Sequence, residues 1–334
     1  MSSPFALSVL DQSPIAQGST GAEALRNTID LAQLTESLGY RRYWVAEHHA
    51  TSMLAGPAPE VLIAGIAAAT SRIRVGSGGV MLPHYSPLKV AETFSVLCGL
   101  YGDRIDLGIG RAPGTDPSTS FALQRDRRVQ AADDFPEQLA ELIAYLDASF
   151  PEGHPLARLA STLPGLPISP ELWLLGSSPQ SAIWAGELGL PYSFADFINP
   201  AGAEIAALYR ERFTPSHELA APRLAIAVST ICAETDAEAE RLAASSRMAI
   251  VQLRRGRPGA VPPVEKALEF LSSVVPSEVS GARRFVVGSP ERVREGLEDV
   301  AAEYGAEEVA VVTITYDHQA RRRSYELIAS AFGL

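Results

Sequence analysis

Residues 25–49 read LRNTIDLAQLTESLGYRRYWVAEHH and contain one complete helix–turn–strand unit. From Leu25 to Leu38 apolar residues recur every three or four positions, which is the spacing of one face of a helix. Gly39 is expected to end this helix, since glycine commonly follows a helix terminus. The aromatic and β-branched run at 42–46 predicts a strand, and three titratable side chains follow it directly.

The same alternation of short apolar runs and longer helical patterns repeats along the chain. It predicts parallel strands that are joined by crossover helices. The eight predicted strands are residues 5–10, 42–46, 73–77, 105–109, 172–175, 192–195, 224–230 and 308–314. Further helices are predicted at residues 59–69, 87–100, 131–146, 179–188, 203–212, 236–251 and 325–332. We therefore expect an α/β fold, a (β/α)8 TIM barrel, in a single domain over residues 1–334.

Two segments interrupt this regular order. The first, at about residues 150–170, is rich in proline and leucine and shows little repeating pattern. The second, at about residues 230–307, holds several helical patterns, an arginine-rich loop at 254–263 and a short extra strand at 285–287. Insertions in the loops of a barrel commonly carry substrate specificity. We expect the second to form a lid or subdomain.

The composition is that of an ordinary globular protein. With 334 residues, 46% apolar, the chain can bury a large core without a disulfide or metal. The net charge of -11, with Lys89 and Lys266 as the two lysines among 28 basic residues, disfavours nucleic acid or an anionic membrane as a partner. Cys98 and Cys232 lie in separate apolar stretches and are expected to be buried thiols. The absence of a basic leader and of an apolar run near the roughly 20 residues that span a bilayer predicts a cytoplasmic protein.

Polar, titratable and glycine residues follow most of the predicted strands. In α/β barrels the C-terminal strand ends meet at the active site, so these residues are expected to share one rim of a pocket. Helix caps and turns would account for single positions such as Ser177 or Gly78, but not for the whole set. The strand-end residues are Asp11, Gln12, Glu47, His48, His49, Ser77, Gly78, Gly79, Gly110, Arg111, Gly176, Ser177, Ser178, Asp196, Asp317 and His318.

Glu47, His48 and His49 form the densest titratable cluster of this rim. Such a cluster fits a metal site, a general base with its orienting partner, or a buried hydrogen-bonded network. Neighbouring residues of an extended chain point to opposite sides, so His48 and His49 are poorly placed to bind one ion. Neither His-x-His nor His-Glu-x-x-His occurs. We expect no metal, one histidine that faces the pocket as a general base, and a structural role for the other.

Ser77, Gly78 and Gly79 end a β-branched strand, and the two glycines would let a planar ligand approach the backbone closely. Neither GSGG at residues 76–79 nor GIGRAPG at 108–114 has the glycine offsets of a dinucleotide-binding fingerprint. A planar ligand other than a dinucleotide is therefore expected at this strand end.

Gly176, Ser177 and Ser178 precede a predicted helix, whose free N–H groups and positive dipole end would bind an anion. Arg127 and Arg128 belong to a basic run that opens another helical segment. For most of this basic run a solvated charge run is the expected reading. The functional alternative is a mononucleotide phosphate held between a helix N-terminus and one of these arginines.

At these residues the sequence resembles the luciferase-like flavin monooxygenases, whose best-known member is bacterial luciferase. The resemblance is carried by WVAEHH at 44–49, IRVGSGGVMLP at 73–83 with HYSP and AETF behind it, RIDLGIGRAPG at 104–114, and LGSSPQSAIWAGELGLPYSFADF at 175–197. It covers at least residues 5–197 and resumes at FVVGSPERV and the last strand.

This resemblance implies a (β/α)8 barrel, usually dimeric, that binds reduced FMN with the flavin ring in the barrel mouth. His48 matches the catalytic histidine of the family. The residues matched to the flavin are Gly78 and Gly79 against the ring, often through a cis peptide bond, Arg111 near the ring, Ser177 and Ser178 in the phosphate loop, and Arg127 or Arg128 at the phosphate. Ser77, Gly110 and Gly176 complete the expected cofactor-binding set, and Asp11, Glu47, His49 and Asp196 are expected to support it.

The sequence also departs from luciferase itself. Gly110 stands where luciferase has a cysteine, and Asp196 or Phe197 stands where it has an aromatic residue near the ring edge. Light emission is therefore not expected. The predicted activity is that of a monooxygenase that takes reduced FMN from a separate flavin reductase and uses O2 to oxygenate a small organic substrate.

Three other functions remain open at this point. Relatives of the family use the deazaflavin F420 for hydride transfer, a flavin-binding protein without turnover would need the same pocket, and a metal-dependent hydrolase would share the barrel but not the histidine spacing. A homodimer is also predicted, with core packing as the alternative, because the helices after strands two and three are rich in apolar residues. These are Val61, Leu62, Ile66, Val90, Phe94 and Leu97.

Overall fold

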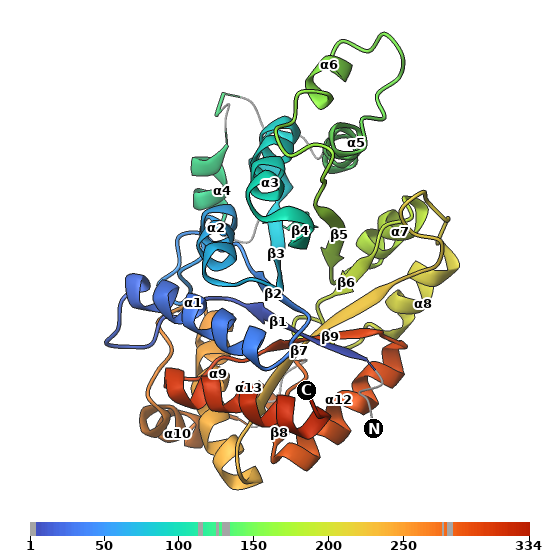
Figure 1. The fold of residues 1–334 in the computed structure, drawn as a ribbon. Coiled ribbons are helices and arrows are strands. Elements are labelled where there is room, and N and C mark those ends of the chain that lie inside the picture. The colour runs from blue at the N-terminus through green and yellow to red at the C-terminus, as the bar shows by residue number, and fades with distance from the viewer. Residues whose placement is uncertain (1–4, 113–115, 125–126, 129–133, 276, 279–282) are drawn as a thin grey trace.

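A computed structural model describes residues 5–112, 116–124, 127–128, 134–275, 277–278 and 283–334. Within them, eight parallel strands close into a barrel in the order β1-β2-β3-β4-β5-β6-β7-β9, and β9 returns to β1 (Figure 1). These strands are β1 (Ala6–Asp11), β2 (Arg42–Val45), β3 (Arg74–Met81), β4 (Ile105–Gly110), β5 (Glu171–Gly176), β6 (Tyr192–Phe194), β7 (Leu224–Cys232) and β9 (Glu308–Val312). The predicted (β/α)8 barrel is confirmed, with a strand at each predicted position.

Helices surround the strands, as Figure 1 shows. Helix α1 shows why they begin and end where they do. Thr20 caps it by accepting the N–H of Glu23, and Gly39 follows its end at a φ of +89° that favours glycine. The described helices are α1 (Gly21–Ser37), α2 (Pro59–Ala69), α3 (Pro87–Tyr101), α4 (Pro117–Leu123), α5 (Phe135–Leu146), α6 (Ala157–Ala160), α7 (Pro179–Glu187), α8 (Ala203–Glu211), α9 (Asp236–Arg254), α10 (Val264–Ser272), α12 (Pro290–Tyr304) and α13 (His318–Phe332), with 3₁₀ turns at Leu82–His84 and Gly102–Arg104.

Helices α13 and α4 illustrate two ways in which the structure differs from the sequence prediction. Helix α13 begins at His318 rather than at residue 325, because Asp317 caps its first turn by accepting the N–H of Ala320 at 3.0 Å. The polar residues of this first part gave no apolar periodicity. Helix α4 was not predicted, since it contains no buried residue and so no apolar face. Of the predicted helix 131–146, residues 131–133 lie outside the described residues.

The two predicted insertions follow α5 and β7. The first contains α6, extends away from the barrel in Figure 1, and is joined to α3 where the N–H of Gly165 donates to Ser95 Oγ at 2.8 Å. The second contains α9, α10 and the extra strand β8 (Val286–Gly288), which is found one residue later than predicted. β8 pairs with Thr230–Cys232, the C-terminal end of β7, so the second insertion is hydrogen-bonded to a barrel strand.

Most of the apolar residues that suggested a dimer surface pack inside the chain. Val61 is 69% exposed, whereas the other five residues of that set are buried. The buried ones are Leu62, Ile66, Val90, Phe94 and Leu97. The apolar pattern therefore reflects the packing of α2 and α3 on the barrel, and it does not support the dimer prediction.

Cys98 and Cys232 are buried thiols, as predicted, and burial raises the pKa of each to about 12. Among the described residues, no three His, Cys, Asp or Glu side chains lie close enough together to hold a metal ion. None of the described helices is long and apolar enough to cross a membrane.

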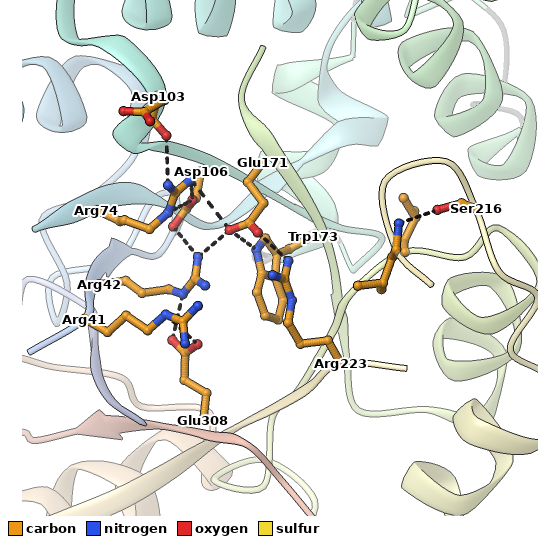
Figure 2. Close-up of polar contacts among 12 residues, drawn as sticks. Arg41, Arg42, Arg74, Asp103, Asp106, Glu171, Trp173, Ser216, Arg223 and Glu308 are labelled. Atoms are coloured by element: carbon orange, nitrogen blue, oxygen red, sulfur yellow. Dashed lines mark hydrogen bonds and ion pairs between the residues drawn. The ribbon is translucent and has the colours of Figure 1, made fainter. Parts of the chain in front are cut away.

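Charged residues close the N-terminal end of the barrel (Figure 2). The buried guanidinium of Arg42 donates to Asp106 at 2.9 Å, to Glu171 at 2.6 Å and to Glu308 at 2.7 Å. Arg74 adds two hydrogen bonds to Asp106, at 2.8 and 2.6 Å. All five residues stand at the first or second position of their strands, and they are called the ionic layer below. Pairing with several opposite charges lets these groups be buried.

Aromatic and small apolar side chains fill the barrel above the ionic layer. The rings of Trp44 and Trp173 meet edge to face with centroids 5.2 Å apart, and Trp44 Nε1 donates to Asp106 at 2.9 Å. The guanidinium of Arg42 lies 4.7 Å from the Trp173 ring, within the range of a cation–π interaction. The two tryptophans cluster with Leu10, Ala46, Ala225, Ala227, Ala310 and Val312, and this set is called the apolar layer.

Candidate active site

A cavity of about 580 Å³ opens at the C-terminal ends of the strands, above the apolar layer. Its volume falls within the range of roughly 300–1,000 Å³ that is typical of small-molecule sites. Eight of the predicted site residues line it, namely His48, Gly78, Gly79, Gly110, Arg111, Gly176, Ser177 and Ser178. The prediction that strand-end residues share one pocket therefore holds for this part of the set.

His48 reaches the cavity because side chains alternate along β2 and the residues after it. Arg42 and Trp44 point into the barrel, and Ala46 and His48, at the same parity, line the cavity. The backbone N–H of His48 donates to the carbonyl of Gly56 at 3.0 Å, which closes the loop that follows. Of the two histidines that follow β2, His48 is therefore the one that lines this cavity.

Glu47 has the opposite parity and points away from the cavity into a buried polar cluster. Its carboxylate lies 2.7 Å from His49 Nε2, accepts the Tyr85 hydroxyl at 3.0 Å, and accepts the Met81 N–H at 2.9 Å. Burial, followed by the charge of Glu47, raises the pKa of Tyr85 well above its usual value, so this hydroxyl stays protonated as the donor. Glu47 thus links the loop after β2 to the end of β3, where Met81 lines the cavity.

Glycines form the wall at the end of β3. The peptide bond between Gly78 and Gly79 is cis, as the family resemblance implies, and the register with β4 shifts at this point. A Cβ on Gly78 would lie 2.5 Å from Leu10 Cδ1, and one on Gly79 would lie 2.7 Å from the carbonyl oxygen of Gly108. Gly79 faces backbone that cannot move aside, so this position requires glycine, whereas a side chain at Gly78 would have to displace the end of the Leu10 side chain.

Ser77, the other predicted residue of this strand end, does not line the cavity. Its hydroxyl donates to the carbonyl of Gly108 at 2.9 Å and accepts the Gly108 N–H at 3.0 Å. Because Gly78 lines the cavity, its neighbour Ser77 points the other way. Ser77 joins β3 to β4 and so supports the glycine wall from behind.

The opposite side of the cavity is polar. Ser178 caps helix α7 and its hydroxyl accepts the Ser181 N–H, which leaves the first turn of the helix directed at the cavity where Gly176 and Ser177 also lie. The guanidinium of Arg111 lies 5.5 Å from the ring centroid of Trp184, which is part of α7. A cation, two hydroxyls and a helix N-terminus are therefore gathered at one end, which suits a phosphate group.

Arg127 and Arg128 do not line the cavity. Arg127 is exposed, donates to the carbonyl of Ala122 at 2.7 Å, and lies 5.8 Å from the Phe121 ring. Arg128 is also exposed. The structure therefore places Arg111, rather than either of these arginines, at the cavity.

Asp11 is a buried residue behind the cavity, on the face of β1 that contacts the helices. It accepts from Arg321 at 2.5 Å, from the Tyr43 hydroxyl at 2.5 Å and from the Ser13 N–H at 2.7 Å. Burial would raise the pKa of Asp11, but the ion pair with Arg321 and these hydrogen bonds outweigh it and hold the pKa below its usual value. Asp11 therefore joins β1 to α13 as a carboxylate.

Asp196 also lies behind the cavity, between two residues that line it, Ala195 and Phe197. The Tyr304 hydroxyl donates to its carboxyl at 2.8 Å, and Arg284 Nε lies 3.3 Å from the same oxygen. Burial raises the pKa of Asp196 despite these partners. Its contacts hold the segment after β6 against α12, and Phe197 is thereby fixed at the cavity wall.

Several cavity residues were not predicted as site residues. Gln12 was noted only as a strand end, while Met81, Pro83, Phe135, Ser181 and Ser193 were not singled out. Ser193 on β6 and Ala195, the residue directly after the strand, have the same parity, so strict alternation would have found Ser193. Phe135 comes from helix α5, and no local signal in the sequence connects it to the strand ends.

The shape and donor set of this cavity fit FMN. The glycine wall offers a surface without side chains to a planar ring, the apolar layer forms a floor of methyl and methylene groups, and the polar end offers donors to a phosphate. A volume of about 580 Å³ is sufficient for a ligand of mononucleotide size.

The family model described as luciferase-like monooxygenase matches residues 5–308. The uncharacterized protein YwcH of Bacillus subtilis (strain 168) is 46% identical over 330 residues, which are 98% of each chain. The N-acetyl-S-alkylcysteine monooxygenase of the same organism is 39% identical over 329 residues, 97% of each chain. The crystal structure of apo-MsnO8 matches with a TM-score of 0.91 at 46% identity, and covers 99% of this chain and 98% of that chain.

Two more distant structures share the fold. The oxygenating constituent of 3,6-diketocamphane monooxygenase of Pseudomonas putida, in complex with FMN, has a TM-score of 0.72 at 24% identity and covers 97% of each chain. An F420-dependent secondary alcohol dehydrogenase has a TM-score of 0.65 at 13% identity and covers 98% of this chain and 99% of that chain. With the family model matching most of its length and close relatives matching nearly all of it, the chain belongs to the luciferase-like monooxygenase family.

Proposed function

We propose that this protein is a monooxygenase that binds reduced FMN in the cavity and uses molecular oxygen to oxygenate a small organic substrate. One observation carries the proposal: His48, the Gly78–Gly79 wall and the Ser177–Ser178 helix N-terminus all line the same cavity. The fold relative in complex with FMN supports the choice of this cofactor.

The residues of the polar end would hold the phosphate of FMN. The hydroxyls of Ser177 and Ser178 and the backbone N–H of Gln180 in the first turn of α7 would donate hydrogen bonds, and Arg111 would supply a positive charge. The Gly78–Gly79 wall would hold the flat ring. In this arrangement the phosphate and the ring are fixed by different strands, so the orientation of the cofactor is set by the barrel itself.

His48 would transfer a proton to or from the reacting group at the cavity. An imidazole suits this role because its ordinary pKa is close to neutral pH. The apolar layer below and the aromatic side chains of Phe135 and Phe197 at the walls would exclude water from the site. Reduced FMN, when bound, supplies the electrons that activate oxygen.

We further propose that a separate flavin reductase supplies the reduced FMN. The glycine-rich segments GSGG and GIGRAPG lack the offsets of a nicotinamide dinucleotide fingerprint. In the structure GSGG is part of β3, the described residues 108–112 of the second segment lie at the end of β4, and Gly78, Gly79 and Gly110 face the proposed FMN site. Reduced FMN supplied from solution should therefore support turnover, whereas FMN with NADH or NADPH but no reductase should not.

The proposal is tested by anaerobic titration with reduced FMN and with reduced F420, followed by rapid mixing with oxygen. We expect saturable binding of reduced FMN and a slowed, protein-dependent course of its reoxidation in absorbance. Tight binding of F420 with no change in the reoxidation of FMN would instead support a hydride-transfer enzyme. If both cofactors bind but neither reaction is altered, the protein is a flavin-binding protein without turnover.

A small organic thioether is the first substrate class to test, because the 39% identical relative is named for an S-alkylcysteine. With ¹⁸O₂, mass spectrometry would detect one labelled oxygen in the product if the protein is a monooxygenase. The matched control is the same reaction with reduced FMN alone, which measures oxidation by free hydrogen peroxide.

A homodimer is also part of the proposal. Val61 of α2 and Val96 and Leu100 of α3 are exposed apolar residues on neighbouring helices of the described chain. Sedimentation at micromolar concentration should give the mass of two chains of 35.6 kDa. The mass of one chain at that concentration would contradict a stable dimer.

A further inference from the structure

A second cavity, of about 400 Å³, lies where the second insertion meets two loops of the barrel top. One loop follows β1 and contributes Gln17, another follows β2 and contributes Ser52, and the insertion contributes the remaining residues. The insertion residues are Met248, Ala249, Gln252, Arg257, Gly259, Ala260, Pro262 and Lys266. This cavity is called the insertion cleft below, and none of its residues lines the candidate active site.

The insertion cleft is positively charged although the chain carries a net charge of -11. Arg257 and Lys266 are its two charged residues, and its lining contains no aspartate or glutamate. Lys266 Nζ donates to Gln17 Oε1 at 2.9 Å, which uses one of its three N–H donors. Among the described residues, no carboxylate pairs with Arg257 or Lys266. Two cations with unused donors therefore face one cavity.

Acidic residues of the insertion are paired elsewhere. Glu265, next to Lys266 in sequence, forms an ion pair with Arg241 at 3.0 Å. Glu278 forms an ion pair with Arg255 at 2.5 Å, and the bond is bidentate. Both carboxylates are thus engaged by other arginines. The charge of the insertion cleft is not neutralised from within the insertion by these groups.

Backbone hydrogen bonds hold the walls of the insertion cleft in place. The N–H of Gln17 donates to the carbonyl of Val261, and the N–H of Val261 donates to the carbonyl of Ile15, both at 2.8 Å. On the other side, the N–H of Arg257 donates to the carbonyl of Gln252 at 2.9 Å. The backbone positions of Arg257 and Gln17 are therefore set by the fold, so the walls of the cleft need not be ordered when a ligand binds.

We propose that the insertion cleft binds a compact oxyanion, the carboxylate or phosphate group of a small molecule. Arg257 and Lys266 would supply charge-assisted hydrogen bonds, and the amides of Gln17 and Gln252 and the hydroxyl of Ser52 would supply neutral ones. The proposal does not rest on the proposed oxygenation. It assigns a second ligand site to loops that also carry the candidate active site, since Gln12 and His48 line the first cavity on the same two loops.

The four methionines of the chain allow the two cavities to be observed separately. Met248 lines the insertion cleft and Met81 lines the candidate active site. Met53 lies in the loop after β2, which contributes His48 to the candidate active site and Ser52 to the insertion cleft. In protein labelled with ¹³C at the methionine methyl groups, NMR titration with sodium acetate or sodium phosphate should shift the Met248 signal in a saturable way. Sodium chloride at the same ionic strength should not. Saturation by acetate alone or by phosphate alone identifies which oxyanion the cleft prefers.

The two lysines of the chain provide a matched pair of variants. Lys266→Gln should weaken binding at Met248 by about fivefold or more, as expected for the loss of one charge-assisted hydrogen bond. Lys89→Gln removes the same charge from an exposed site on α3 and should leave the binding constant unchanged. Arg257→Gln should act like Lys266→Gln. Unchanged Met53 and Met81 signals would verify that each variant is folded.

Three results would overturn the proposal. The Met248 signal fails to shift with either oxyanion beyond its change in chloride, or Lys266→Gln and Lys89→Gln weaken binding equally, or the Met81 signal saturates while Met248 does not move. The last result would place the anion in the candidate active site, and it would leave the proposed function intact while excluding the insertion cleft as a site.

Discussion

The two ends of the barrel are formed by the same strands but have different roles: one end is closed by buried charges, and the other end opens into a cavity. On β2, Arg42 at the first position and His48 just beyond the last point to the same side, yet Arg42 is buried among three carboxylates while His48 lines a cavity. The N-terminal end uses large charged groups that satisfy one another. The C-terminal end uses glycines, serines and a histidine that leave space and donors for a ligand. The side chains of Arg42 and His48 both point toward the barrel axis because they are an even number of residues apart. Whether such a residue stabilises the fold or lines the site depends on its position between the N-terminal and C-terminal ends of the strand.

Removing Arg42 should have the largest effect on stability. Arg42→Ala would leave Asp106, Glu171 and Glu308 close together without their shared partner, and we expect a loss of about 3–5 kcal/mol in the free energy of unfolding. Arg41→Ala is the control, because Arg41 is half exposed and lies 3.8 Å from Glu308; it should cost at most about 1 kcal/mol. Urea denaturation measures both. Equal losses would mean that the ionic layer contributes no more than a surface ion pair.

Removing the imidazole of His48 should have the converse effect. His48→Ala is expected to slow oxygenation by about a hundredfold or more, the usual contribution of a positioned acid or base, while the free energy of unfolding changes by less than about 1 kcal/mol. His217→Ala removes an imidazole whose side chain is 97% exposed and should change neither. Rates are measured with reduced FMN in excess. A variant that loses stability but keeps its rate would assign His48 to the structure rather than to the site.

The ionic layer should also be sensitive to acid. Burial would raise the pKa of Glu171, but Arg42, Arg223 and Arg74 outweigh it and lower the pKa to about 2. A folded-state pKa below the unfolded value of 4.5 means that this carboxylate stabilises the fold above pH 4.5 and loses its contribution between that pH and about 2. Glu171→Gln should therefore be less stable at neutral pH and show a shallower loss of stability in this acid range. Parallel curves for the variant and the parent protein would contradict the shift.

A smaller effect is expected at the polar end of the cavity. Ser177→Ala should weaken FMN binding by about three- to tenfold through the loss of one hydrogen bond to the phosphate, with no measurable change in stability. Ser161→Ala removes an exposed hydroxyl beside α6 and should leave the affinity unchanged. Fluorescence titration with FMN compares the two. No difference between them would place the phosphate elsewhere in the cavity.

The barrel was predictable because apolar strands and amphipathic helices alternate in the sequence, and the pocket was predictable because polar residues follow the strands. The prediction did not use the alternation of side chains along each strand, and so it assigned residues from both faces to the pocket. Asp11, Glu47, Ser77 and Asp196 all stand at strand ends, but each is next to a residue that lines the cavity and therefore points to the opposite side. There they meet Arg321, His49, Gly108 and Tyr304. Parity counted from Leu10, Ala46, Gly78 and Ala195 would have separated the two groups.

The remaining features depend on contacts that sequence patterns do not contain. The ionic layer arises from single charged residues at the starts of β2, β3, β4, β5 and β9, which approach one another only after the barrel closes. Arg127 and Arg128 were considered for a phosphate site from their basic run and from the resemblance, and the position of a loop arginine is set by its local turn. The role of Phe135 depends on how α5 packs against the barrel, which no local periodicity specifies.

The apolar layer has a consequence for engineering. Its upper surface, formed by Leu10, Ala46 and Ala227, is the floor of the cavity, while the tryptophans below it rest on the ionic layer. Replacing Ala227 or Ala46 by valine or leucine would raise this floor and shorten the cavity without changing a charged or catalytic group. The depth of the site, and with it the length of substrate that fits, is therefore adjustable through two methyl groups.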